Sequence, residues 1–148
     1  MSKREILAKA GEAETLNVMG NQIALLCTGA QNGGAWSLIE AVFPQGSGPP
    51  MHHHDWDECY YVVEGQMRFQ LPGREQQLSA GDFFYAPAGL THGFQGASAT
   101  PARMLVFDVP SHQEGYFRDA AREVVDLPAD FAKVPAIGER HGIQFVKK

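Results

Sequence analysis

Residues 49–65, "PPMHHHDWDECYYVVEG", are the most informative stretch of this chain. Three consecutive histidines are followed by Glu58 and then by aromatic and β-branched residues, which favour a strand. Because side chains alternate between the two faces of a strand, His52, His54 and Glu58 share one face and His53 points to the other. Two imidazoles and a carboxylate that converge in a protein interior are typical ligands of a divalent metal ion.

The rest of the chain up to about residue 110 has the same β character. Short apolar runs such as "QIALLC" (22–27), "WSLIEAVF" (36–43) and "ARMLVFDV" (102–109) are separated by turn residues. Several short strands at intervals of roughly 8–12 residues favour a sandwich or barrel over alternating strands and helices. The sequence therefore predicts an all-β antiparallel domain over 13–110, preceded by a polar N-terminal segment, 1–12.

The last part of the chain, 111–148, changes to a helical pattern. Ser111 and Glu114 match a capping box at the start of a helix. The apolar positions then follow helical spacing at Phe117, Ala120, Ala121 and Val124. A second short helical piece is expected from Pro135 to Gly142. We expect this helical tail to bury its apolar face on the β domain or on a partner subunit.

A fourth metal ligand is expected from another part of the chain. His92 is the best candidate, because it follows the Pro-x-Gly turn of "APAGLTHGFQ" (86–95) at the start of a further strand. Burial of these side chains without an ion would leave unpaired polar groups, at a cost of about 1–3 kcal/mol each. The residues alone therefore favour a metal site.

These motifs resemble those of the cupins. The first cupin motif has a Gly, five residues, His-x-His, three or four residues, Glu, six residues and a Gly. In this chain those positions are filled by Gly46, His52, His54, Glu58 and Gly65. Every defined position of the first motif is thus present.

The second cupin motif has a Gly, five residues, Pro-x-Gly, two residues, His, three residues and an Asn. Gly81, Pro87, Gly89 and His92 fill it, but Gly96 stands where the Asn is expected. Since that Asn is not a metal ligand in the family, the departure concerns the local loop and leaves the ligand set complete.

The resemblance implies a jelly-roll β-barrel of six to eight antiparallel strands that holds one divalent metal ion. The ligands carried over from the motifs are His52, His54, Glu58 and His92. The ion is Fe, Mn, Ni, Zn, Co or Cu, and its identity does not follow from the ligand types. The chain layout also resembles small cupins that are similar to quercetin dioxygenases.

The predicted activity is a metal-dependent dioxygenase that acts on a small aromatic or enolic compound, with Glu58 as a ligand or as the catalytic base. The alternatives are a non-enzymatic cupin that binds or senses a small molecule, and a metal-dependent isomerase or decarboxylase. Residues expected to line the substrate pocket are Trp56, Tyr60, Phe69, Phe84 and Phe94.

Composition excludes several other classes of partner. The net charge is −5 and the basic residues form no cluster beyond Lys147-Lys148, so nucleic acid and anionic membranes are not expected partners. No apolar run reaches the roughly 18 residues of a membrane span, and the N-terminus does not match a secretion signal. We therefore expect a cytoplasmic protein in which Cys27 and Cys59 are reduced, buried thiols.

The run "CYYVV" (59–63) is apolar on both faces. One face is expected to line the barrel interior. The other must be covered by the N-terminal strands or by a second subunit, so together with the helical tail it favours a homodimer. The family resemblance implies the same.

Overall fold

A computed structural model describes residues 3–147 of the chain. Its largest sheet has six antiparallel strands in the order β1–β2–β3–β10–β5–β8. Their bounds are β1 Glu14–Val18, β2 Asn21–Cys27, β3 Ser37–Phe43, β10 Ala102–Val109, β5 Asp57–Glu64 and β8 Phe83–Ala86. A second sheet has three antiparallel strands in the order β7–β6–β9, namely Arg74–Ser79, Gln66–Leu71 and Gly93–Gly96.

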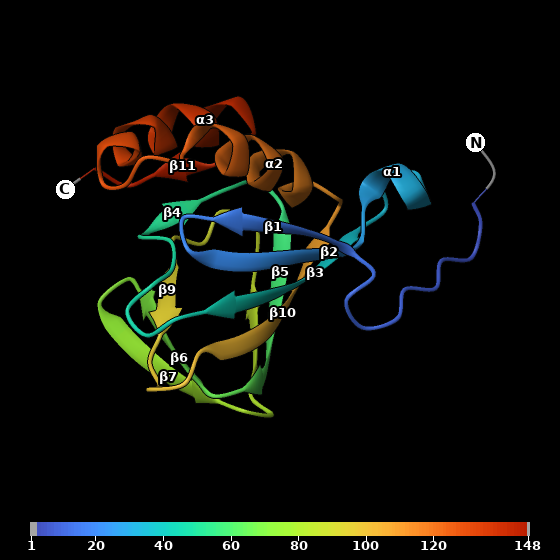
Figure 1. Cartoon of the computed structure of the whole chain (residues 1–148). Coiled ribbons are helices and arrows are strands. Elements are labelled where there is room, and N and C mark those ends of the chain that lie inside the picture. Colours follow the sequence, from blue (N-terminus) through green and yellow to red (C-terminus); the bar gives the residue numbers. More distant parts are fainter. Residues whose placement is uncertain (1–2, 148) are drawn as a thin grey trace.

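The two sheets pack face to face, and the core lies between them (Figure 1). The side chains of β3 illustrate this packing. They alternate strictly between buried and half-buried, as expected for a strand with one face on the core. Phe43 on β3 meets Phe94 on β9 edge to face at 5.4 Å, and Tyr60 on β5 meets Phe69 on β6 at 5.1 Å. Aromatic side chains from both sheets thus fill the interior.

The predicted all-β jelly-roll class is confirmed, but the barrel is not closed by hydrogen bonds among residues 3–147. The chain leaves the large sheet at Gly65, whose left-handed backbone (φ 76°) turns it from β5 into β6. An isolated bridge between Gln45 and Gly96 also joins the segment after β3 to β9. The molecule is therefore a sandwich with open sheet edges where a continuous barrel was expected.

The C-terminal tail lies across one end of the sandwich (Figure 1). It consists of α2 Gln113–Glu123, the 3₁₀ helix η1 Ala129–Lys133, α3 Val134–Arg140 and β11 Gln144–Phe145. Strand β11 pairs antiparallel with β4, His52–His53, so the end of the chain is joined to the histidine run. Tyr116, Ala120 and Val124 are buried against the core, as the helical spacing predicts for two of them.

The predicted capping box at Ser111 and Glu114 is wrong. The Ser111 hydroxyl donates to the Glu114 carboxylate (2.7 Å), and the same carboxylate oxygen accepts the backbone N–H of Gly29 (2.6 Å). Gly29 is the first residue of α1, Gly29–Asn32, a short helix that follows β2. Glu114 thus links the start of the tail to a distant turn, because its carboxylate satisfies an N–H group at the first turn of another helix.

Both cysteines are free and half-buried, so the prediction that they are reduced agrees with the structure while full burial does not. No helix within residues 3–147 has the length and apolar character needed to cross a membrane.

Candidate metal centre

The four predicted ligands meet at one point inside the sandwich. His52, His54, Glu58 and His92 are all buried, and each offers one ligand atom within 4.8 Å of the others. Nε2 of His54 and Nε2 of His92 each lie 3.7 Å from Oε1 of Glu58. Two atoms that bind the same ion at about 2.1 Å are separated by roughly 3–4 Å. The residues therefore form a cluster that can hold a metal ion.

Pairing of the backbone brings the ligands together. His52 and His92 face each other across an antiparallel bridge, in which each N–H donates to the other's carbonyl at 2.9 Å. Their rings are 4.5 Å apart as a result. Glu58 is the second residue of β5, where it pairs with Ala86 on β8 and Asp108 on β10. The bridge between His52 and His92 and the two strand pairs of β5 thus converge on the cluster.

All three imidazoles are oriented by backbone carbonyls. Nδ1 of His52 lies 2.8 Å from the Pro50 carbonyl, Nδ1 of His92 lies 2.8 Å from that of Leu90, and Nδ1 of His54 lies 3.1 Å from that of Trp56. Because a carbonyl only accepts, each Nδ1 carries the hydrogen and each Nε2 keeps its lone pair. Nε2 of His54 has no hydrogen-bond partner although it is buried. This is the arrangement expected of metal-binding histidines.

The charge state of the cluster also suits a cation. Burial, and then the neighbouring His92, lowers the pKa of His52 to about 4, so this imidazole is neutral at pH 7. Burial acts to raise the pKa of Glu58, but the polar groups of Asp108, His54 and His92 outweigh it and hold that pKa well below its usual value. Neutral imidazole and ionised carboxylate are the forms that bind metals.

Asp108 and Tyr60 surround Glu58, and the sequence analysis assigned neither to the metal centre. The Tyr60 hydroxyl donates to Glu58 Oε1 and also lies 2.9 Å from Nε2 of His92. Asp108 is fully buried beside Glu58, and burial, followed by the Glu58 charge, raises the pKa of Asp108 well above its ordinary value. The Glu58 charge thus opposes ionisation of Asp108. The sequence did contain a signal for Asp108. It is a charged residue at an inward position of β10, where the other inward residues are apolar.

Trp56 fixes the orientation of His54 in two ways. Its carbonyl accepts from the His54 ring, and its indole stacks on that ring with centroids 4.1 Å apart and planes at 9°. His112 stacks on the opposite side of the indole at 4.3 Å. The His54 ring is thereby held in a layered stack.

A cavity of about 500 Å³ opens from this cluster. Of the predicted pocket residues, Trp56 and Phe94 line it, whereas Tyr60, Phe69 and Phe84 do not. That part of the prediction differs from the structure because Tyr60, Phe69 and Phe84 pack on one another between the sheets, with Phe69 stacked on Phe84 at 5.2 Å.

The C-terminal tail supplies the remaining aromatic wall of this cavity. Its contributions include Tyr116 and Phe117 of α2, Phe131 of η1, and Phe145 of β11, whose ring lies 5.6 Å from that of His52. Among residues 3–147, no lysine or arginine lines this cavity. The cavity is thus largely apolar, with the His/Glu cluster as one of its few polar features.

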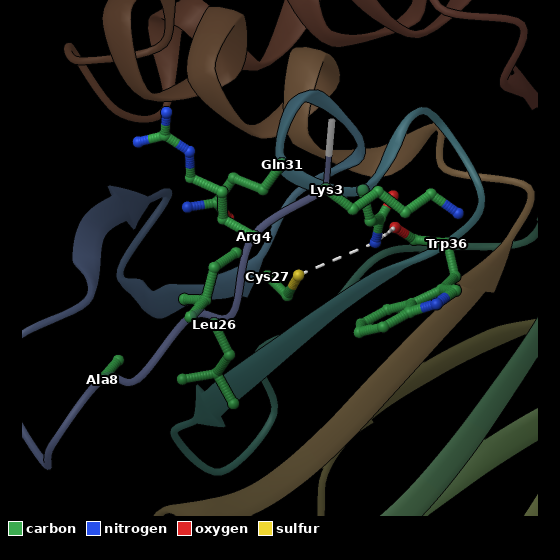
Figure 2. Close-up of a pocket in the computed structure, with 9 residues that line it drawn as sticks. Lys3, Arg4, Ala8, Leu26, Cys27, Gln31 and Trp36 are labelled. Carbon is green, nitrogen blue, oxygen red and sulfur yellow. Dashed lines mark hydrogen bonds between the residues drawn. The ribbon is translucent and has the colours of Figure 1, made fainter. Parts of the chain in front are cut away.

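A second cavity, of about 440 Å³, lies between the N-terminal segment and the β2–α1 region (Figure 2). Figure 2 shows Cys27 near the centre, with Arg4 to its left and Lys3 and Trp36 to its right. Within the described part of the chain, no histidine and no side-chain carboxylate lines it, so it is chemically distinct from the metal centre.

Comparison with known proteins agrees with the fold and the cluster. The family described as "Cupin domain" matches residues 39–108, which include all four cluster residues. Quercetin 2,3-dioxygenase of Bacillus subtilis (strain 168) is 30% identical over 112 residues, which are 74% of this chain and 33% of the relative. The chain therefore spans only a third of the length of that enzyme.

Two solved structures illustrate the likeness of the fold. An RmlC-like cupin from Shewanella frigidimarina NCIMB 400 is 22% identical, with 77% of this chain and 98% of that chain covered and a TM-score of 0.65. The polyketide cyclase RemF from Streptomyces resistomycificus is 24% identical, with 75% and 81% covered and a TM-score of 0.62. The fold and the buried cluster define a jelly-roll protein with a candidate metal centre. Residues 39–108 of the chain therefore match the cupin domain, and the fold is that of cupin structures.

Proposed function

We propose that this chain is a metal-dependent dioxygenase that acts on a small aromatic or enolic compound. The observation that carries the proposal is that a buried cluster of three histidines and one glutamate borders a largely apolar, aromatic cavity, which His52, His54 and Glu58 help to line. An apolar cavity with few polar groups suits a planar organic ligand. The likeness to a quercetin 2,3-dioxygenase supports this choice.

In this proposal His52, His54, His92 and Glu58 hold one divalent first-row metal ion. Such an ion supplies Lewis acidity toward a substrate oxygen. Tyr60 keeps the Glu58 carboxylate in place by donating its hydroxyl hydrogen. In the alternative role, Glu58 is not a ligand of the ion, and its carboxylate takes the proton of an enol or phenol as a general base. The aromatic walls keep water away from the substrate.

Oxygen uptake by metal-loaded protein tests this function. Protein stripped of metal is reloaded separately with Fe, Mn, Co, Ni, Cu or Zn and given a flavonol or a 1,3-diketone. We expect oxygen consumption with at least one ion, and none without metal. Compared at equal metal content, Glu58→Gln is expected to lower kcat by about 10²–10⁴-fold, as the loss of a general base does, whereas His53→Gln leaves it unchanged.

The alternative functions give different outcomes in the same experiment. Turnover of the same compounds without oxygen would replace the dioxygenase by an isomerase or decarboxylase. Tight binding with no turnover under any condition would identify a binding or sensing protein.

We also propose that the chain forms a homodimer through the outer face of the large sheet. Tyr61 and Val63 of β5 and Phe83 and Tyr85 of β8 are exposed there, and strands β1 and β2 lie in the same sheet and leave them uncovered. Exposed apolar patches of this kind mark interfaces. Sedimentation velocity is expected to give twice the chain mass for the wild type and one chain mass for Tyr61→Glu/Phe83→Glu. A wild type that sediments as a single chain would contradict the dimer.

A further inference from the structure

We propose that His112, in the C-terminal tail, is a positioning residue of the metal centre. It acts through Trp56, whose indole it holds against the ring of His54, and it thereby keeps His54 in the orientation that binds the ion. This role rests on the proposed function, because it concerns the ion that the cluster is proposed to hold. His112 lies outside the cluster and outside residues 39–108, which match the cupin domain.

Three rings form a continuous stack that runs from the cluster to the surface. The His54 ring and the Trp56 indole have centroids 4.1 Å apart and planes at 9°. On the other face of the indole, the His112 ring lies at 4.3 Å with planes at 4°. His54 and Trp56 are buried, whereas His112 is exposed. The indole is therefore enclosed between a metal ligand and a residue of the tail.

The backbone around Trp56 is not held by a strand pair. His54 and Trp56 lie in the bend between β4 and β5 and belong to neither strand. A backbone hydrogen bond from the N–H of Gly89 to the His54 carbonyl, at 2.8 Å, ties the bend to the rest of the domain. The Trp56 carbonyl lies 3.1 Å from Nδ1 of His54. A shift of Trp56 would therefore disturb both contacts that orient the His54 ring, the stack and the hydrogen bond.

The outer end of the stack is anchored to the domain. Nδ1 of His112 lies 3.1 Å from the Pro110 carbonyl, which orients the ring. Ser111 and Glu114, on either side of His112, are joined by a 2.7 Å hydrogen bond, and Glu114 also accepts the N–H of Gly29 at the start of α1. The start of α2 is thus fixed, so the His112 ring can serve as a support for the indole.

Loss of this support is expected to weaken metal binding moderately. A stacked aromatic pair favours its own geometry by about 2–10-fold. Without the His112 ring, metal-free protein holds His54 in the binding orientation for only part of the time, and the apparent Kd rises by the inverse of that fraction. We therefore expect His112→Ala to raise the Kd for Co²⁺ about fivefold.

The experiment measures the Kd for Co²⁺ by competition with a chelator, without substrate or oxygen, and records the visible absorption spectrum of the Co²⁺-saturated protein, which reports ligand geometry. His112→Ala is expected to raise the Kd and to change the spectrum. His112→Phe keeps a ring on the indole and is expected to restore both, with a Kd within about twofold of the wild type. His141→Ala is the matched control, because it removes a tail histidine that is bonded to Asp119 at 2.7 Å and leaves the stack intact. Its Kd and spectrum are expected to match the wild type.

Circular dichroism confirms that the variants are folded. A wild-type Kd or an unchanged spectrum in His112→Ala, or a loss that His112→Phe does not restore, would overturn the inference. An equal loss in His141→Ala would overturn it as well, because general loosening of the tail would then explain the effect. Oxygen uptake is measured separately. Metal binding that depends on His112 without any uptake would remove the proposed function and leave the role of His112 intact, whereas uptake by a protein whose Kd is insensitive to His112 would do the reverse.

Discussion

His92→Ala protein, purified without added metal, is expected to retain almost no metal, while the wild type retains about one divalent ion per chain. His92 supplies one of the four converging ligand atoms, and its ring is held in place by the Leu90 carbonyl and the bridge to His52. Loss of a partner that merely orients a ligand costs roughly 10–100-fold in metal affinity. Loss of the ligand itself should therefore cost at least about 100-fold.

His53→Ala is the matched control for this prediction. His53 belongs to the same histidine run, but it lies on the opposite face of β4 and outside the cluster. Elemental analysis and competition with a chromogenic chelator measure content and affinity, and circular dichroism confirms that both variants are folded. Equal loss of metal in His53→Ala and His92→Ala, or full retention in His92→Ala, would contradict the assignment.

Gly96→Asn is expected to destabilise the protein by about 3 kcal/mol, although it restores the residue that the second cupin motif carries at this position. A Cβ atom on Gly96 would lie 2.5 Å from the Pro44 carbonyl oxygen and 2.6 Å from that of Phe43. Both are backbone atoms of the segment that bridges Gly96, so they cannot rotate away. Overpacking of a buried site typically costs 1–3 kcal/mol, and the clash here is with backbone.

Urea denaturation measures this effect through the midpoint and slope of the unfolding curve. Gly96→Ala should also be destabilised, because the Cβ atom alone makes the clash. Gln95→Asn, at a half-buried neighbouring position of β9, should stay within about 0.5 kcal/mol of the wild type. A Gly96→Asn protein as stable as the wild type would show that the segment at Phe43 and Pro44 adapts, and the prediction would be wrong.

The metal centre was predictable from the sequence because it depends on local geometry. The period of two pairs His52 with His54, and the bend between β4 and β5 keeps Glu58 on the same side. The turn before His92 brings that residue to the start of β9. The raised pKa of Asp108 could not be predicted in this way, because its burial beside the Glu58 charge arises only when β5 and β10 pair.

The cavity was predictable only in part. Its lining depends on how the tail folds back, and the pairing of β11 with β4 joins residues almost a hundred positions apart. The sequence pattern shows that Phe145 follows a helix, but not that its ring lies against His52. Phe69 and Phe84, by contrast, stand at positions where the alternation of each strand predicts an inward side chain. Their rings pack on each other and on Tyr60, so they do not line the cavity.

The account depends on one ion being held among four side chains, and diffraction at metal absorption edges tests this most directly. Crystals are grown from protein purified without added metal and, in parallel, from protein soaked with a divalent first-row ion. The account predicts a single anomalous peak within about 2.0–2.4 Å of Nε2 of His52, His54 and His92 and of a Glu58 carboxylate oxygen. No peak at the cluster in either crystal, with these groups bonded to neighbouring protein atoms, would contradict it.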